Sequence, residues 1–229
     1  MALTPADLER IAVRTLGHYE QRAQAFWEGT RDLDVSQNIA ALLQYISVPP
    51  PFELLDFGCG PGRDLMTFRQ LGHRATGVEG AARFAAMARA HSGCEVLQQN
   101  FLQLDLPAGR FDGVFANAAL FHVPGQELPR VLRELHAALK PGGVLFSSNP
   151  RAVERDERDE REGWSGERYS VFHAWPTWRA YVSAAGFVEL AHYYRPAGLP
   201  REQQPWLASV WRKPIILPLG QLTSTAATE

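Results

Sequence analysis

Three glycines at alternate positions, Gly58, Gly60 and Gly62, form the stretch of this sequence best suited to hold a ligand. A glycine lacks a Cβ atom, so the backbone can turn sharply there and a ligand can approach where a side chain would block it. The short apolar run 52–57 precedes the glycines, and apolar residues at helical spacing follow them. This order predicts a strand, a tight turn and a helix, the arrangement at which doubly wound folds bind nucleotides.

A second group with binding chemistry is the carboxylate of Glu79. Residues 73–78 alternate in the manner of a second strand, and Glu79 at its end lies about twenty residues after Gly58. A carboxylate at this strand tip can accept hydrogen bonds from both hydroxyl groups of a ribose. The glycine spacing departs from the dinucleotide pattern Gly-x-Gly-x-x-Gly, because Arg63 stands in the place of the last glycine. That departure argues against NAD as the ligand.

Asp-x-Gly-x-Gly-x-Gly at residues 56–62, followed by Gly-Val-Glu-Gly at residues 77–80, resembles the cofactor site of class I S-adenosylmethionine-dependent methyltransferases. The resemblance is to the small-molecule (type 11-like) members and extends over about residues 15–213. It implies an α/β fold with a doubly wound, Rossmann-like sheet of seven mainly parallel strands. The last strand would be antiparallel, and an N-terminal helical cap would precede the sheet.

The resemblance also implies which residues contact S-adenosylmethionine. Glu79 would bind the ribose, while Asn100 and Phe101 would contact the adenine; an ordinary strand end is the alternative for these two. Tyr19 would approach the cofactor from the N-terminal helices, unless it is a packing residue of an ordinary helix. The full expected set is Tyr19, Asp56, Gly58, Gly60, Gly62, Arg63, Glu79, Gly80, Asn100, Phe101, Asn117 and Phe121.

Three residues are candidates for a catalytic role, namely His122, Tyr169 and His173. A histidine has an unperturbed pKa of about 6.5, which suits proton removal at neutral pH. His122 lies in Leu-Phe-His-Val, a segment that resembles the loop after the fourth strand of small-molecule methyltransferases, where this histidine is often structural. A general base and a loop histidine anchored by a backbone hydrogen bond are both open interpretations. No metal site is expected.

Alternating strands and helices would position these residues. Thr4-Pro5 predicts a capped helix start, and the helical region continues through Tyr19 to Trp27. The expected strands are 52–57, 73–78, 95–98, 111–117, 144–148, 187–194 and 206–211, and further helices are expected at 39–46, 81–91, 127–139 and 176–187. The expected organisation is a helical cap at 1–50, a methyltransferase domain at 51–213 and a tail at 214–229.

Residues 151–175 form a charged and aromatic insertion within that domain. The run 154–162 contains only charged residues, with opposite charges at i, i+4 spacing, which favours an exposed helix. The alternative is a lid over the acceptor that carries Arg168, Tyr169 and His173 inward.

Composition limits the partners and the cellular location that can be expected. The chain has 229 residues, a net charge of −2 and no sustained basic stripe, which disfavours a nucleic-acid partner. Neither a signal peptide nor a membrane-spanning run is evident, and a disulfide between the two cysteines is not expected. The sequence thus predicts a soluble, cytoplasmic monomer or homodimer that does not enter membranes.

The function predicted by the resemblance is methyl transfer from S-adenosylmethionine to a small-molecule acceptor by direct in-line displacement. Asn117 is not followed by Pro-Pro-aromatic, which weakens a role on amide or base nitrogens. The alternatives are a non-catalytic S-adenosylmethionine-binding protein, a protein acceptor, and an NAD-dependent oxidoreductase, against which the absence of an evident Tyr-x-x-x-Lys pair also argues. An acceptor pocket with aromatic walls is expected from Trp164, Tyr169, Trp175 and Trp178.

Overall fold

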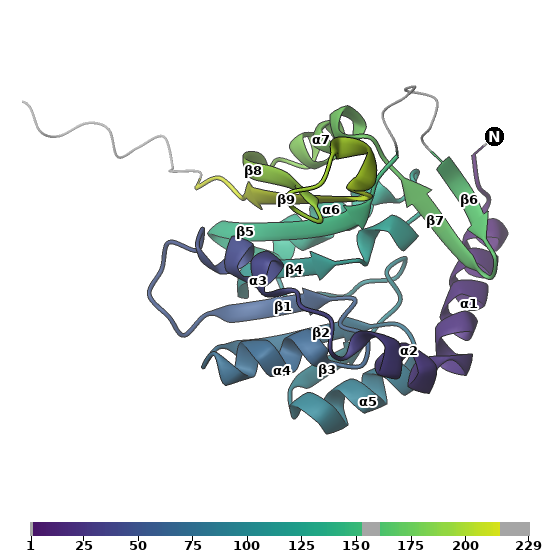
Figure 1. The fold of residues 1–229 in the computed structure, drawn as a ribbon, viewed down its shortest axis with the longest axis horizontal. Coiled ribbons are helices and arrows are strands. Elements are labelled where there is room, and N and C mark those ends of the chain that lie inside the picture. The colour runs from purple at the N-terminus through teal and green to yellow at the C-terminus, as the bar shows by residue number, and fades with distance from the viewer. Residues whose placement is uncertain (1, 153–160, 216–229) are drawn as a thin grey trace, which may run out of the picture.

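The computed structural model describes residues 2–152 and 161–215. Within them, seven strands form one sheet in the order β3-β2-β1-β4-β5-β9-β8 (Figure 1). The strands are β1 (Glu53–Phe57), β2 (Arg74–Glu79), β3 (Glu95–Gln98), β4 (Phe111–Asn117), β5 (Leu139–Pro150), β8 (Val188–Arg195) and β9 (Trp206–Arg212). All pairs from β3 to β5 are parallel, and β9 runs antiparallel to both of its neighbours, β5 and β8. The predicted fold class is confirmed.

Helices cover both faces of this sheet, as the buried central strands require. On one face, α6 (Leu128–Ala138) and α7 (Trp175–Ala184) pack in a core that includes Leu55 and Val114. On the other face, α3 (Ser36–Leu43) and α4 (Arg63–Gln70) pack around Leu54 and Phe115. Neighbouring residues of one strand thus enter opposite cores, the alternation expected of β-structure.

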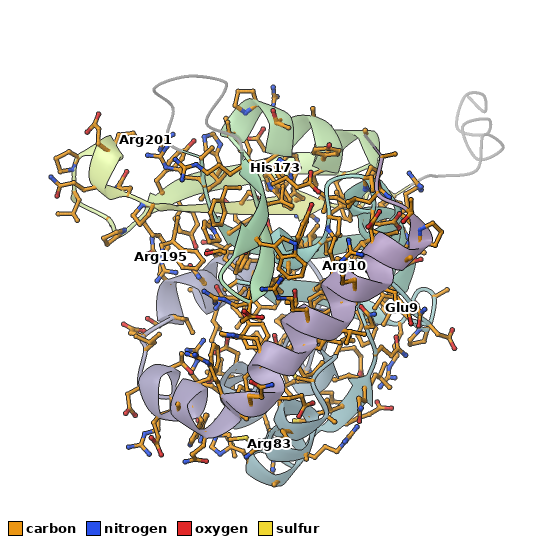
Figure 2. The ribbon with its side chains drawn as sticks, turned by 90° about the vertical axis from the view of Figure 1, so that its right-hand side faces the viewer. Glu9, Arg10, Arg83, His173, Arg195 and Arg201 are labelled. Carbon is orange, nitrogen blue, oxygen red and sulfur yellow. The ribbon has the colours of Figure 1, made fainter. Side chains whose placement is uncertain are left out.

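Two N-terminal helices, α1 (Pro5–Gln21) and α2 (Ala23–Thr30), lie at the end of the sheet where the glycine turn stands (Figure 1). Thr4 and Asp7 form a capping box at the start of α1, which confirms the predicted helix start. The helical region extends beyond Trp27, as expected, but a break at Arg22 divides it into two helices. Figure 2 views this end directly, with α1 lying across it. α1 is thereby placed over the ligand-binding edge of the parallel strands.

Part of the 151–175 insertion is a β-hairpin, which the sequence did not predict. β6 (Arg161–Ser165) pairs antiparallel with β7 (Arg168–Phe172) beside α1 (Figure 1). The expectation of a helix is wrong for residues 161 and 162, because their backbones pair with β7. The rest of the charged run, like the tail beyond residue 215, lies outside the described residues.

The other predicted elements occur with small shifts of their ends. α5 (Ala82–Ser92) links β2 to β3 as expected. β5 is longer than predicted, because its first residue pairs with Phe111 and its last with Trp206. Cys59 and Cys94 are free thiols, as expected. Among the described residues, no helix combines the length and apolarity needed to cross a membrane.

A test of the packing at the glycine turn is Gly62→Ala. Gly62 has a φ of 93°, and a Cβ atom there would lie 2.8 Å from the Cα atom of Ala88 on α5. The variant should lose about 2–5 kcal/mol of unfolding free energy, from backbone strain and steric overlap together. Gly72→Ala is the control, since Gly72 has a φ of 85° but no atom within 4 Å of the added Cβ. It should lose only about 1–2 kcal/mol. Equal losses in urea denaturation would contradict the steric role of Gly62.

Candidate functional site

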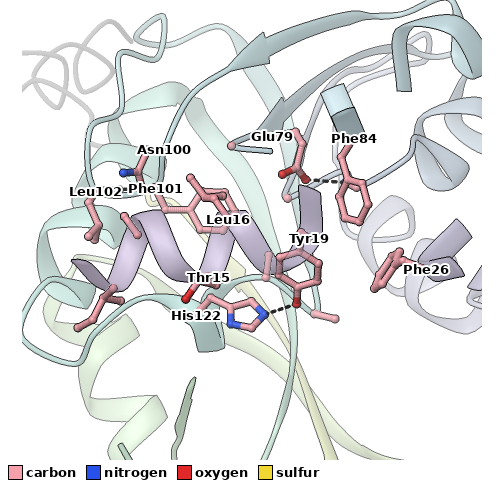
Figure 3. A pocket seen from close by; sticks show the side chains of 17 residues that line it. Thr15, Leu16, Tyr19, Phe26, Glu79, Phe84, Asn100, Phe101, Leu102 and His122 are labelled. Carbon is pink, nitrogen blue, oxygen red and sulfur yellow. Dashed lines mark hydrogen bonds between the residues drawn. The ribbon is translucent and has the colours of Figure 1, made fainter. Parts of the chain in front are cut away.

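A pocket opens between α1 and the carboxyl ends of the parallel strands (Figure 3). Its empty volume, counted together with the open solvent at its mouth, is about 730 Å³. The lining residues are Ile11, Ala12, Thr15, Leu16 and Tyr19 of α1, Phe26, Gly58, Gly60, Glu79, Gly80, Phe84, Asn100, Phe101, Leu102, Ala118, Ala119 and His122.

The pocket brings together about half of the predicted site residues. Those that line it are Tyr19, Gly58, Gly60, Glu79, Gly80, Asn100, Phe101 and His122. Those that do not line it are Asp56, Gly62, Arg63, Asn117, Phe121, Tyr169 and His173.

The glycines of the turn serve different purposes. A Cβ atom on Gly58 would lie 2.6 Å from the Cβ of Ala119, so the loop after β4 can close against the turn only if this residue is glycine. Gly60 borders the pocket and donates its backbone N–H to Glu79. Gly62 instead allows α4 to contact α5. Gly62 thus serves the close packing of two helices and not the binding of a ligand.

Glu79 is buried at the tip of β2, and its carboxylate faces the pocket (Figure 3). Its two oxygens accept the backbone N–H groups of Gly60 at 3.0 Å and Ala81 at 2.8 Å. Burial raises the pKa of Glu79 to about 7, and the two backbone donors oppose that rise. Glu79 is thus a rigid hydrogen-bonding group whose charge is sensitive to pH near neutrality.

A second buried carboxylate, Asp56, lies below the glycine turn. Its Oδ2 atom has no hydrogen-bond partner among the described residues. Burial, and next the nearby carboxylate of Asp64, hold the pKa of Asp56 well above its usual value. Arg63 does not neutralise Asp56 directly, because its guanidinium binds Asp64 at 2.7 and 2.9 Å and the carbonyl oxygen of Thr30 at 2.9 Å. This part of the molecule is suited to a cationic ligand.

Asn100 and Phe101 stand side by side at the pocket wall after β3 (Figure 3). The Asn100 Oδ1 atom accepts the backbone N–H of Leu102 at 3.0 Å, which fixes the direction of its amide group. The ring of Phe101 stacks on Phe57, with centroids 4.2 Å apart. One polar group and one flat apolar surface therefore meet at the same wall.

His122 and Tyr19 form a hydrogen-bonded pair across the pocket (Figure 3). The Nδ1 atom of His122 lies 2.7 Å from the carbonyl oxygen of Tyr169, which can only accept, so Nδ1 carries the proton. Nε2 then accepts the hydroxyl group of Tyr19 at 2.7 Å. Burial lowers the pKa of His122 to about 4, so the ring is neutral at pH 7. Because both nitrogens are engaged, the geometry supports a structural histidine more than a general base.

Asn117 and Phe121 lie beside the pocket, outside its lining. Asn117 accepts from the Nδ2 atom of Asn38 at 3.0 Å and so joins the tip of β4 to α3. The ring of Phe121 lies between His122, with a centroid distance of 3.9 Å, and Phe172 of β7, at 6.3 Å.

Tyr169 and His173 are not brought to the pocket. Tyr169 is in strand β7; its ring packs with Ile11, and its hydroxyl donates to Glu162 at 3.0 Å. His173 packs against the rings of Trp178 and Tyr181.

The four aromatic residues expected to form the acceptor pocket do not surround one cavity. Trp178 is buried in the core, and Trp175 stacks on His192 with centroids 4.0 Å apart. Trp164 lies under the guanidinium of Arg14, and the ring of Tyr169 packs as described above. None of the four lines the pocket of the glycine turn. That expectation is wrong for these side chains.

The sequence analysis missed the apolar part of the pocket wall. Ala12 and Leu16 of α1 face the pocket, and their i, i+4 spacing marks a common helix face. Phe84 of α5 packs against Tyr19 and Phe26, with centroids 5.5 and 5.0 Å away respectively. Apolar spacing alone could not distinguish these side chains from ordinary core residues.

The raised pKa of Glu79 predicts a pH-dependent difference in stability. A carboxyl group whose pKa rises from 4.5 to about 7 on folding binds more protons when folded, so stability falls as pH rises through that interval. Glu79→Gln lacks this proton uptake. As the pH rises from 5 to 8, the unfolding free energy of the variant should therefore increase by on the order of 2–4 kcal/mol relative to that of the wild type, measured by urea unfolding. Parallel pH profiles of the two proteins would contradict a raised pKa.

The His122 ring should remain neutral well below pH 7. Its pKa of about 4 predicts that its NMR signals show the Nδ1–H tautomer without titrating between pH 7 and about 5. A lowered histidine pKa also means that stability is lost as pH falls from about 6.5 toward 4. Tyr19→Phe removes the donor to Nε2 and should raise this pKa. A midpoint near 6.5 in the wild type would rule out the described geometry.

Comparison with known proteins agrees with this geometry. A family model described as a methyltransferase domain matches residues 55–147. A trans-aconitate 2-methyltransferase of Paracidovorax citrulli is 30% identical over 166 residues, which cover 67% of this chain and 58% of that protein. A sterol 24-C-methyltransferase of Gibberella zeae is 26% identical over 196 residues, which cover 76% of this chain and 49% of that protein. The chain thus spans only about half the length of these curated relatives.

Among solved structures, a Burkholderia thailandensis 1,6-didemethyltoxoflavin-N1-methyltransferase with bound 1,6-didemethyltoxoflavin and S-adenosylhomocysteine has a similar fold. The TM-score is 0.74 at 22% identity, and the alignment covers 93% of each chain. The matched segment 55–147 contains the glycine turn, Glu79 and the loop with His122. The family match and the sheet order together place this chain in the methyltransferase-domain family, among the class I S-adenosylmethionine-dependent methyltransferases.

Proposed function

We propose that the protein transfers a methyl group from S-adenosylmethionine to a small-molecule acceptor by direct in-line displacement. The observation that carries the proposal is the buried carboxylate of Glu79, held by the backbone of the glycine turn and facing the pocket. In this position it can accept hydrogen bonds from both ribose hydroxyls. Asn100 and Phe101, at the neighbouring strand tip, offer a polar group and a ring surface to an adenine.

The charges of the site fit a cationic cofactor. S-adenosylmethionine, when bound, supplies an electrophilic methyl group on a positively charged sulfur. Asp56 offers a buried oxygen without a partner, and Arg63 is already bound to Asp64. The pyrophosphate of NAD would meet unfavourable carboxylate charges here. The charges of the site and the glycine spacing thus both favour S-adenosylmethionine over NAD.

The contribution of the chain to such a reaction is to position the reactants and to exclude water. α1 covers the pocket with the side chains of Ala12, Leu16 and Tyr19. His122 fixes the hydroxyl group of Tyr19, and the carbonyl oxygen of Tyr169 fixes His122. The hydroxyl group at the pocket wall is therefore held in one direction before any acceptor arrives.

A small-molecule acceptor is supported by the relatives. Their names specify trans-aconitate, a sterol and 1,6-didemethyltoxoflavin, which share only their small size. The net charge of −2 also favours this class over a nucleic acid. We extend the class to this chain, without choosing among carbon, nitrogen, oxygen and sulfur as the methylated atom.

The proposal is tested first by thermal unfolding with S-adenosylhomocysteine and, separately, with NAD. A ligand at a hundred times its dissociation constant adds about 2.7 kcal/mol, which corresponds to about 5–10 °C in a chain of this size. We expect that shift with S-adenosylhomocysteine alone, and a smaller one in Glu79→Gln. Glu95→Gln is the matched control, because Glu95 stands at the opposite end of the sheet and pairs with Arg110. A shift with NAD, or with neither compound, would refute the proposal.

Binding alone does not distinguish an enzyme from a sensor. The second measurement is transfer of labelled methyl from S-adenosylmethionine to a panel of small molecules. Turnover of at least one acceptor supports the enzyme; binding without turnover across a broad panel supports the non-catalytic alternative.

A further inference from the structure

We propose that Arg168 binds an anionic group of the acceptor, such as a carboxylate carried on a flat apolar body, beside Phe121 and Phe172. The inference rests on the proposed function and specifies the class of its acceptor. It starts from the hairpin face that carries Arg168 and from the charge that this face leaves without a counterion.

The alternation of β7 turns Arg168 and Tyr169 to opposite sides. Tyr169 and Val171 pack with Ile11 of α1 in a small apolar cluster. Arg168 shares the other side with Phe172, and its Nη1 atom lies 3.5 Å from the hydroxyl oxygen of Tyr19. The ring of Phe172 approaches Phe121, the neighbour of His122, with centroids 6.3 Å apart. This side of the hairpin therefore faces the loop after β4, next to the pocket.

The charge of Arg168 is not neutralised by any carboxylate among residues 2–152 and 161–215. Its neighbour Glu167 is bound by Arg14 at 2.6 and 2.9 Å. The 3.5 Å contact with Tyr19 is at the limit of a hydrogen bond, and the partner is neutral. A half-buried guanidinium without a counterion is stabilised by binding an anionic ligand, which can accept two parallel hydrogen bonds from it.

Nearby groups respond to this positive charge. Burial lowers the pKa of His18, and the charges of Arg168 and Arg22 lower it further. Burial likewise dominates the lowered pKa of His122, to which Arg168 also contributes. The rim of the pocket next to α1 and β7 is thus electropositive, whereas Glu79 lines the pocket at the tip of β2, and Asp56 is buried nearby in β1. The two halves of the site suit ligands of opposite charge.

Tyr19 links the two halves, because it lines the pocket and also contacts Arg168. An anion held by Arg168 would place the body of the acceptor against Phe121 and Phe172, adjacent to the pocket. The reacting atom would then be presented from a fixed anchor, which is how orientation lowers the barrier of a displacement. The rings of Phe121 and Phe172 offer flat apolar surfaces to such a molecule.

The test uses two flat probes, benzoate and its neutral counterpart benzamide, titrated calorimetrically into the full chain saturated with S-adenosylhomocysteine. We expect benzoate to bind about tenfold or more tightly than benzamide, as a charge-assisted pair implies. Arg168→Gln should remove that preference, whereas Arg168→Lys should retain part of it. Benzoate that fails to bind, or binds no better than benzamide, overturns the proposal.

Arg22→Gln is the matched control. It removes the same charge from the same region, but Arg22 is exposed to solvent. If Arg22→Gln weakens the binding of benzoate as much as Arg168→Gln does, the preference for benzoate comes from the overall positive charge of the region. A specific anion site at Arg168 is then refuted. S-adenosylhomocysteine binding, measured in each sample, separates the two proposals. If it persists while benzoate fails, only the anion site is refuted; if it is absent in the wild type, the proposed function is refuted.

Discussion

The site depends on the double hydrogen bond by which Glu79 receives the backbone N–H groups of Gly60 and Ala81. One carboxylate thereby joins the glycine turn after β1 to the start of α5 after β2. The turn has left-handed glycine conformations and few side chains of its own, and this bond fixes its position together with the backbone N–H groups of Gly58 and Cys59, which both donate to the carbonyl oxygen of Val78. Burying a carboxylate for this purpose is costly, and the raised pKa of Glu79 is the measure of that cost.

Opposite charges are separated within a short span of the molecule. The carboxylates of Asp56, Asp64 and Glu79 are buried under the glycine turn, with Arg63 bound to one of them. Arg168 stands on the far side of Tyr19 and His122, on a hairpin that is not part of the sheet. The hydrogen-bonded pair of Tyr19 and His122 lies between the buried carboxylates and Arg168. Neither member of the pair carries a charge at neutral pH. A cationic and an anionic ligand can thus bind next to each other, each beside protein groups of the opposite charge.

Much of the fold was predictable because its signals are local. The glycine turn and the buried run of β4 follow from glycine conformation and apolar spacing, and Glu79 was placed by its position at a strand tip. The hairpin β6–β7 was not predictable, since its residues 161 and 162 continue a charged run that favours a helix by its spacing. Their strand conformation is set by pairing across the hairpin. The orientation of Tyr169 also escaped prediction, because its ring packs against Ile11, which is distant in the sequence. Arg63 was expected to meet the cofactor, but it binds its neighbour Asp64 and the carbonyl oxygen of Thr30.

The contact between α1 and the hairpin has a consequence for how fast a ligand can enter and leave. α1 is one wall of the pocket, and it is bound to the hairpin by Arg14 with Glu167 and by Thr15 with the backbone of Tyr169. Any outward swing of α1 must break these bonds or carry the hairpin along. The same swing would separate Tyr19 from His122. The residence time of a bound ligand should therefore depend on the contacts between α1 and the hairpin, and not on the ligand's own contacts alone.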